Sequence, residues 1–504
     1  MTDRLSPITL ERIDPDAVKV IRRLTRNEYQ AYLVGGCVRD LLLGRTPKDF
    51  DVATNATPPE IRKLFRNCRI IGRRFRLAHI FFGPKIIETS TFRADPGADA
   101  DANGEDPMIW QDNVFGTAEE DARRRDFTIN GLFFDLASGQ VLDTVGGMAD
   151  VRAGLVRTIG DPQRRFREDP VRILRAVKFA ARLELRIETE TEAAMIEQRG
   201  LIARCSVARV LEEIYRILGS GSAAPAFALM HRTGVLAVLF PEVAATLAPP
   251  DSPTARQVVA AIRPTRRRRL ELVADGADEL AFASEANGAG DELPEPPAPL
   301  AEGAPEDAPF DERAEAESLM EAIGLARLGP RAAAGSMVPF CLEAVDRLVV
   351  QARTDGHEPL SHAVLLGSLL APLAGPALVE ELTIGETVER IDQLVASVAT
   401  RLQVSRRDRE RLRHILVAQR RLAQARPRQA IRDRDYFAEA MQLLELRDAV
   451  TGEFASAIEQ WNTLEQKHRR GGRKRRRRRG AAAATEAHEL LVEALEDELP
   501  EEVP

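Results

Sequence analysis

The stretch that decides the fold is residues 30–53, QAYLVGGCVRDLLLGRTPKDFDVA. Its first part, Gln30–Val34, is a short apolar segment that is typical of a β-strand. After two glycines, the apolar positions of Cys37–Leu43 predict a helix that ends at Gly44. Asp49–Ala53 predicts a second strand. A strand, a glycine turn, a helix and another strand in this order predict a small α/β domain around the stretch.

Two aspartates stand at the start of the second predicted strand. Because side chains alternate along a strand, Asp49 and Asp51 are expected on one face, about 7 Å apart. Carboxylates placed in this way can hold two Mg²⁺ ions, of which one lowers the pKa of an attacking hydroxyl and the other holds a triphosphate. Two solvated acids on an exposed strand are the alternative. The glycine turn upstream favours the metal site, with both residues as ligands and catalytic groups.

The glycine pair and the helix after it form a candidate phosphate site. Gly35 and Gly36 allow the backbone to approach phosphate oxygens, because neither residue carries a Cβ. Arg39 follows one helical turn later and could pair with a phosphate. Glu88, at the apolar start of a strand predicted over Ile86–Phe92, is expected either as a third acid beside the metals or as an edge-facing glutamate.

Three arginines stand before a further apolar strand in the segment Arg123–Asn130. Together they make a candidate phosphate site, since guanidinium groups bind phosphate through parallel hydrogen bonds. Asp126 and Asn130 could hydrogen-bond a ribose hydroxyl, which would favour ribonucleotides. The alternative is a strand start at which the arginines pair with the acidic run Glu119–Asp121.

Residues 168–172, EDPVR, open a long apolar helix predicted over Val171–Leu185. Asp169 and Arg172 are three residues apart and therefore lie on one helix face. A carboxylate accepts from the amino group of adenine or cytosine and a guanidinium donates to the adjacent ring nitrogen, whereas guanine and uracil present the reverse order. The pair could thus replace a template base. A local alternative is that Asp169 is an N-cap and Pro170 the first helical residue.

The composition is that of a globular protein, with 44% hydrophobic and 30% charged residues in a chain of 504. A chain of this length is expected to form about two to four domains. It contains no run of about 18 apolar residues, so no membrane-spanning helix is expected. The four cysteines are dispersed and lack zinc spacing, which favours a cytoplasmic protein with reduced thiols.

Basic residues are clustered although the net charge is −7, and local clusters decide where phosphate binds. Arginine-rich segments at Arg73–Arg76, Arg266–Arg269 and Arg469–Arg479 are candidate contacts to an RNA backbone. The last of these lies in a tail that is expected to be disordered by itself.

The whole chain is predicted to be α+β, with a small α/β head followed by an elongated all-helical neck and body. Helical periodicity begins near Phe166 and is interrupted by an acidic segment with few large apolar residues. The predicted order is a catalytic head (16–158), a helical neck (159–245), a helical basic segment (246–282), an acidic Pro/Ala-rich linker (283–315), a helical body (316–465) and a disordered tail that is Arg-rich and then acidic (466–504).

Six segments occur in one order over about residues 30–245: LVGGCVRDLLLG, KDFDVATNATP, IIETSTFR, EEDARRRDFTING, DTVGGMADVRAGLVRTIGDPQRRFREDPVRILRAVKFAARL and GVLAVLFPEV. As a set they resemble the class II nucleotidyltransferases, the family of tRNA CCA-adding enzymes and bacterial poly(A) polymerases. Within that family, the segment IIGRRFRLAHIFFG, the expected helices near residues 435–464 and the arginine-rich tail are similar to the polymerases.

The resemblance implies an enzyme that adds AMP from ATP to RNA 3′ ends without a template, using two Mg²⁺ ions, with a body and a basic tail that bind RNA. CCA addition to tRNA is the alternative within the family. A catalytically inactive RNA-binding protein is the alternative outside it. The implied roles are metal binding for Asp49 and Asp51, triphosphate binding for Gly35, Gly36 and Arg39, nucleotide positioning for Arg125 and Asp126, base recognition for Asp169 and Arg172, and a further catalytic acid in Glu88.

Overall fold

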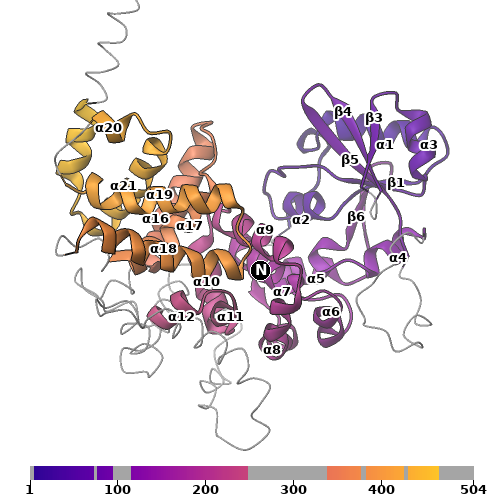
Figure 1. The fold of residues 1–504 in the computed structure, drawn as a ribbon. Coiled ribbons are helices and arrows are strands. Elements are labelled where there is room, and N and C mark those ends of the chain that lie inside the picture. Colours follow the sequence, from indigo (N-terminus) through magenta and orange to yellow (C-terminus); the bar gives the residue numbers. More distant parts are fainter. Residues whose placement is uncertain are drawn as a thin grey trace, which may run out of the picture. The chain divides into compact units, whose positions relative to one another are not determined.

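The computed structural model describes residues 5–72, 76–94, 115–247, 338–375, 382–424 and 429–464 (Figure 1). The chain divides into two units, Met1–Leu360 with Ala396–Ser405 and Ser361–Val395 with Arg406–Pro504. No helix in the described ranges is long and apolar enough to cross a membrane. Most of the predicted basic segment, the acidic linker and the tail lie outside the described residues.

A seven-stranded sheet forms the head, in the order β3-β4-β5-β2-β1-β6-β7 (Figure 1). Strand β2 runs parallel to β5, and the other neighbouring strands pair antiparallel. A mixed sheet followed by helices confirms the predicted α+β class. The strands are β1 (Ala31–Val34), β2 (Val52–Thr54), β3 (Cys68–Ile71), β4 (Leu77–Phe82), β5 (Lys85–Thr91), β6 (Leu132–Asp135) and β7 (Gln140–Asp143).

The central strand β1 is packed on both faces. On one face the Tyr32 ring stacks on Phe92, with ring centroids 6.0 Å apart, and meets Phe133 edge-on at 6.2 Å. Leu33 points to the opposite face, where helix α1 (Pro15–Thr25) packs against β1. The other helices of the head are α2 (Gly36–Leu42), α3 (Pro58–Leu64), α4 (Ala118–Arg123) and α5 (Gly147–Ala153).

A sharp turn at Gly35 connects β1 to helix α2. Gly35 has a φ of +73°, a conformation that glycine adopts at little cost, and its N–H donates to the carbonyl of Leu132 at 3.0 Å. Helix α2 buries Val38 and Leu41 and contacts β1 and β6. The strand, turn and helix predicted from this stretch are therefore confirmed.

Helix α7 (Val171–Leu183) lies at the centre of the neck. It packs against α9 (Val207–Leu218) and α10 (Ala223–Arg232) with its apolar residues. Phe179, on its other side, meets Phe127 of the head edge-on with centroids 5.8 Å apart. The remaining elements of this region are β8 (Leu155–Val156), α6 (Pro162–Glu168), β9 (Arg186–Ile187), α8 (Thr189–Gln198), α11 (Val235–Leu239) and α12 (Pro241–Leu247).

Helix α16 (Val338–Thr354) belongs to the same unit as the neck, whereas the sequence analysis placed it in the body. The Asp346 carboxylate accepts hydrogen bonds from the N–H groups of Ala223 and Ala224, at 2.6 and 2.9 Å. Asp346 thus caps the start of α10 from a distant part of the chain. A cap of this kind leaves no local signal in the sequence.

The second unit is built from helices. A Cβ at Gly367 would lie 3.2 Å from both Ile415 and Leu443, so glycine allows α17 (His362–Ala374) to approach two neighbours closely. The Trp461 ring N–H donates to the carbonyl of Leu422 at 3.0 Å. The other helices are α18 (Ile384–Arg401), whose first part belongs to this unit, α19 (Arg406–Leu422), α20 (Gln429–Arg432) and α21 (Phe437–Thr451).

Candidate active site

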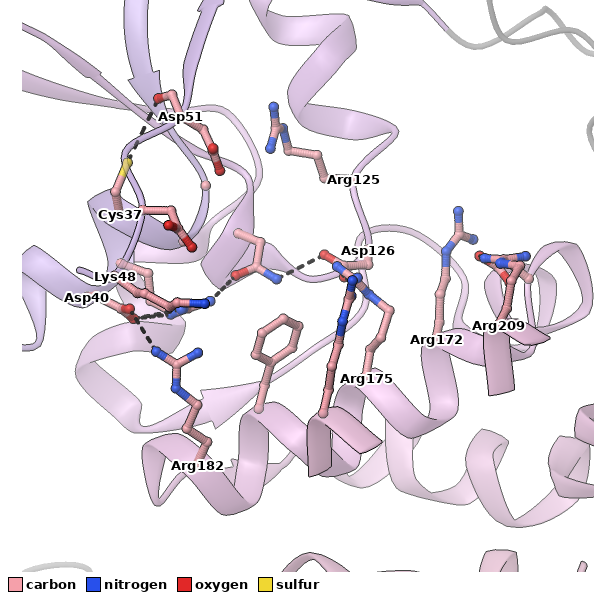
Figure 2. Close-up of a pocket in the computed structure, with 18 residues that line it drawn as sticks. Cys37, Asp40, Lys48, Asp51, Arg125, Asp126, Arg172, Arg175, Arg182 and Arg209 are labelled. Atoms are coloured by element: carbon pink, nitrogen blue, oxygen red, sulfur yellow. Dashed lines mark hydrogen bonds and ion pairs between the residues drawn. The ribbon is translucent and has the colours of Figure 1, made fainter. Parts of the chain in front are cut away.

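Nine of the ten candidate residues line one pocket of about 570 Å³ between head and neck elements of the first unit (Figure 2). Glu88 is the exception. Eight basic and five acidic side chains line the pocket. The surplus of positive charge suits an anionic ligand such as a nucleoside triphosphate.

Asp49 and Asp51 lie in the segment immediately before β2. The predicted strand begins later than expected, at Val52, because only the carbonyl of Asp51 is paired with β1, where it accepts from the Val34 N–H at 3.1 Å. Both carboxylates nevertheless line the pocket. In the described part of the chain, no three His, Cys, Asp or Glu side chains already converge as a metal cluster.

The electrostatics at Asp51 favour a bound cation. Burial, together with the negative charges of Glu88 and Asp49, raises the pKa of Asp51 to about 6, against the opposing effect of Arg125. Glu88 lies on β5 beside β2, where it is exposed and 3.6 Å from His79. A half-buried carboxylate repelled by two other acids is stabilised by a divalent cation, so Asp49 and Asp51 fit Mg²⁺ as ligands.

Magnesium should stabilise the protein more strongly as the pH rises through about 6. Because the pKa of Asp51 is raised from 3.8 to about 6, its protonated form contributes stability at low pH that is lost as the pH rises through 6. A cation bound to the ionised carboxylate restores this stability. We expect Mg²⁺ to raise Tm by a few degrees near neutral pH and by less at about pH 5.

Thermal unfolding of the wild type and of Asp51→Asn, with and without Mg²⁺, measures this effect. The variant carries no titrating group at position 51, so its response to Mg²⁺ should be weaker and should lose this pH dependence. Equal responses in both proteins at every pH would contradict the assignment of Asp51 as a metal ligand.

The glycine turn lies directly beside arginine side chains. A Cβ at Gly35 would lie 3.1 Å from Nη1 of Arg125, and one at Gly36 would lie 3.5 Å from Nη2 of Arg39. Arg125 is held by Asp121, with its Nη2 2.8 Å from Oδ2, and packs over the Phe133 ring. Because neither glycine carries a Cβ, the guanidinium groups of Arg125 and Arg39 lie close to the turn, and both glycines line the pocket.

Arg39 is buried and its guanidinium is already hydrogen-bonded. Its Nε and Nη2 donate to Oδ1 of Asp40 at 2.8 and 2.6 Å, and its Nη1 donates to Oδ1 of Asn130 at 2.5 Å. The group also lies over the Phe179 ring, 5.1 Å from its centroid. Arg39 thus contributes positive charge to the pocket wall from a fixed position.

Asp126 joins the head to the neck. Its Oδ2 accepts from Nε and Nη2 of Arg175 at 2.8 and 2.5 Å, and its Oδ1 accepts from Nδ2 of Asn130 at 3.0 Å. Burial would raise the pKa of Asp126, but Arg175 and Asn130 hold it well below its usual value. Asp126 and Asn130, the two side chains expected to contact a ribose, are thus hydrogen-bonded within the protein. The three arginines before Asp126 form salt bridges with Glu119 and Asp121, as the alternative to a phosphate site predicted.

The Asp169 side chain does not cap helix α7, so the local alternative is wrong on this point. Its Oδ2 instead accepts from Nη2 of Arg209 at 2.7 Å, and Pro170 occupies the N-cap position. Oδ1 of Asp169 is a buried oxygen without a hydrogen-bond partner. An unpaired buried acceptor that lines a pocket is a position for a ligand donor.

Arg172 is anchored by one nitrogen. Its Nη1 donates to the Arg165 carbonyl at 2.9 Å and to Oε2 of Glu168 at 3.1 Å. Its Nε and Nη2 have no hydrogen-bond partner among the described residues and remain available to a ligand. Asp169 and Arg172 therefore present an acceptor and donors to the same pocket.

Comparisons with known proteins agree with this geometry. Residues 31–157 match the family described as "Poly A polymerase head domain", and residues 184–247 match one described as "Probable RNA and SrmB- binding site of polymerase A". Over these two segments the chain is similar to poly(A) polymerases, and CCA-adding enzymes are also related to it. The resemblance inferred from its sequence is confirmed.

Poly(A) polymerase I of Salmonella typhi is 49% identical over 241 residues, which are 47% of this chain and 52% of that protein. The CCA-adding enzyme of Geobacillus stearothermophilus is 36% identical over 224 residues, 44% of this chain and 54% of that protein. The chain thus spans about half the length of the curated relatives that it matches. The crystal structure of the Bacillus stearothermophilus CCA-adding enzyme with CTP aligns with a TM-score of 0.41 at 24% identity, over 86% of this chain and 99% of that one.

The pocket also includes cationic residues that were not predicted from the sequence. Arg175 and Arg182 lie three and ten residues after Arg172, with Phe179 between them, so all four share one face of α7. That spacing was a signal available in the sequence. Lys48 directly precedes Asp49, whereas Arg209 and Arg216 reach the pocket from α9, which only the tertiary structure places there.

Proposed function

We propose that this chain adds AMP from ATP to RNA 3′ ends without a template. The observation that carries the proposal is one pocket lined both by the paired acids Asp49 and Asp51 and by Asp169 and Arg172, whose free acceptor and donors match a nucleobase edge. The similarity to poly(A) polymerase I supports ATP and RNA as substrates.

The reaction is an adenylyl transfer. The oxygen of the RNA 3′-hydroxyl bonds to the α-phosphorus of ATP, the bond from this phosphorus to the bridging oxygen breaks, and pyrophosphate leaves with the electron pair while the hydroxyl proton passes to water. Asp49 and Asp51 would hold two Mg²⁺ ions, which when bound lower the pKa of the hydroxyl and offset the charge of the triphosphate. Glu88, whose charge already acts on Asp51, would add a third acid on that side.

The walls of the pocket would bind and orient the nucleotide. The backbone of Gly35 and Gly36, which line the pocket without a Cβ, would approach phosphate oxygens, and the Arg125 guanidinium lies beside Gly35. Arg39 and Asp126, each held by several hydrogen bonds, would act by position and charge, since neither has to move when the ligand enters.

Base choice would depend on the free atoms at the start of α7. Oδ1 of Asp169 can accept from the adenine amino group, and the free nitrogens of Arg172 can donate to the adjacent ring nitrogen. Guanine and uracil would place a donor against Arg172 and an acceptor against Asp169. Because the site is largely buried, those unpaired groups would be costly and the two bases would be rejected.

CCA addition to tRNA is the second candidate, since the same pair accepts cytosine and a CCA-adding relative is 36% identical. The 49% identity to poly(A) polymerase I favours polyadenylation. An RNA-binding protein with an inactive head is the third. An inactive head would have no need of a buried acid with a raised pKa at Asp51 together with an unpaired acceptor at Asp169.

Product length separates these candidates. We expect the purified chain to build long, heterogeneous tails on an unstructured RNA from ATP alone, with CTP a poor substrate. A tRNA without its CCA end should not be repaired to a defined length when CTP and ATP are both present. A single product three nucleotides longer, made only from tRNA, would establish CCA addition, and no product from any RNA would favour the inactive protein.

A further inference from the structure

Arg182 lies at the end of α7 opposite to Arg172, and the proposed reaction does not yet use it. Its side chain lines the pocket and is 40% exposed. Its one hydrogen bond from the side chain within the described residues runs from Nη2 to Oδ2 of Asp40, at 3.4 Å. That distance is near the limit of a hydrogen bond, so the contact is weak.

Asp40 has little capacity left for Arg182. The Asp40 carboxylate is buried and receives two short hydrogen bonds from Arg39, at 2.8 and 2.6 Å, through its other oxygen. Two guanidinium groups thus share one carboxylate. Burial lowers the pKa of Arg39, and the charge of Arg182 lowers it further against the effect of Asp40. This end of the pocket therefore carries an uncompensated positive charge.

The position of Arg182 matches the far end of a bound nucleotide. Arg172 and Arg182 are ten residues apart on one face of α7, which corresponds to about 15 Å along the helix axis. This is comparable with the length of a nucleoside triphosphate from its base to its last phosphate. Figure 2 shows Arg172 and Arg209 on one side of the pocket and Asp51 and Arg182 on the other. A base held at Arg172 would direct its phosphates toward Asp51 and Arg182.

We propose that Arg182 binds the terminal phosphates of the incoming nucleotide and of the leaving pyrophosphate. The direction of the nucleotide rests on the proposed function, whereas the affinity for a polyphosphate rests on the pocket alone. On binding, Arg182 exchanges its weak contact with Asp40 for charge-assisted hydrogen bonds to phosphate oxygens. Asp40 keeps its two hydrogen bonds from Arg39, so the exchange leaves no buried charge unpaired.

Calorimetric titration of inorganic tripolyphosphate into the full chain tests the proposal without requiring catalysis. Arg182→Gln should raise the Kd for tripolyphosphate by about tenfold or more, while the Kd for AMP, which lacks the terminal phosphates, stays unchanged. Arg182→Lys should recover part of the affinity, because it keeps the charge and loses the planar pair of donors. Arg186→Gln is the matched control, since Arg186 is exposed on β9 outside the pocket.

The outcomes separate this proposal from the function on which it rests. If Arg182→Gln binds tripolyphosphate as the wild type does, or loses AMP and tripolyphosphate equally, Arg182 does not bind the terminal phosphates. A lower Tm with an unchanged Kd would likewise make Arg182 a structural link to Asp40 and overturn the proposal. If tripolyphosphate binding depends on Arg182 but the wild type does not extend RNA, the anion site stands and the proposed reaction fails.

Discussion

Asp51→Asn should abolish extension of RNA by ATP, with a loss in rate of about a thousandfold or more. An amide cannot replace the negative charge that a metal ion requires, and every step at the α-phosphorus depends on that charge. Asp49→Asn is expected to have the same effect, since both carboxylates line the pocket.

The loss of activity should come without a loss of fold. The raised pKa of Asp51 means that its charge is costly in the metal-free protein, so the Asp51→Asn variant, which is neutral at this position, should unfold at the same or a higher temperature near neutral pH. Asp135→Asn is a suitable control, because Asp135 ends β6 of the same sheet and lies outside the pocket. Near-wild-type rates for Asp51→Asn at saturating Mg²⁺ would remove the metal assignment.

Arg172→Ala should weaken the preference for ATP over GTP and UTP by about 1–3 kcal/mol, or roughly five- to 150-fold. The variant loses the donors that recognise the ring nitrogen of the base, so correct and incorrect nucleotides become more alike. Single-nucleotide extension rates for the four NTPs measure the change. Stability should fall little, because the Arg172 side chain gives only two hydrogen bonds within the described residues.

Arg172→Ala also removes a salt bridge to Glu168, and Arg164→Ala is the control for the loss of such a bridge. Arg164 pairs with Oε1 of Glu168, the residue whose other oxygen holds Arg172, and it does not line the nucleotide pocket. It should therefore leave base selection intact. If Arg172→Ala destabilises the fold and keeps wild-type selectivity, Arg172 supports the helix start and does not read the base.

The sequence by itself determined the local helices and strands and the paired acids of the site, Asp49 and Asp51. Gly35 and Gly36 after an apolar strand predicted the turn into α2, because few other residues adopt that backbone conformation. The change from alternating to helical periodicity near Phe166 predicted the neck, whose α7 buries one continuous apolar face. Asp49 and Asp51 were expected together from their spacing on a strand, and both line the pocket, although β2 begins only after them.

Only the tertiary structure decided which charges are free and which are satisfied. Asp126, Asn130 and Arg39 were expected to contact the nucleotide, but each is bonded to a partner that is distant in the sequence or lies on another element. Asp169 was a suitable N-cap by its position, yet its Oδ2 accepts a hydrogen bond from Arg209 of α9 and its Oδ1 has no partner. The physical reason is that residue spacing determines which face a side chain occupies, whereas the balance of charge at that face depends on groups that folding brings from elsewhere in the chain.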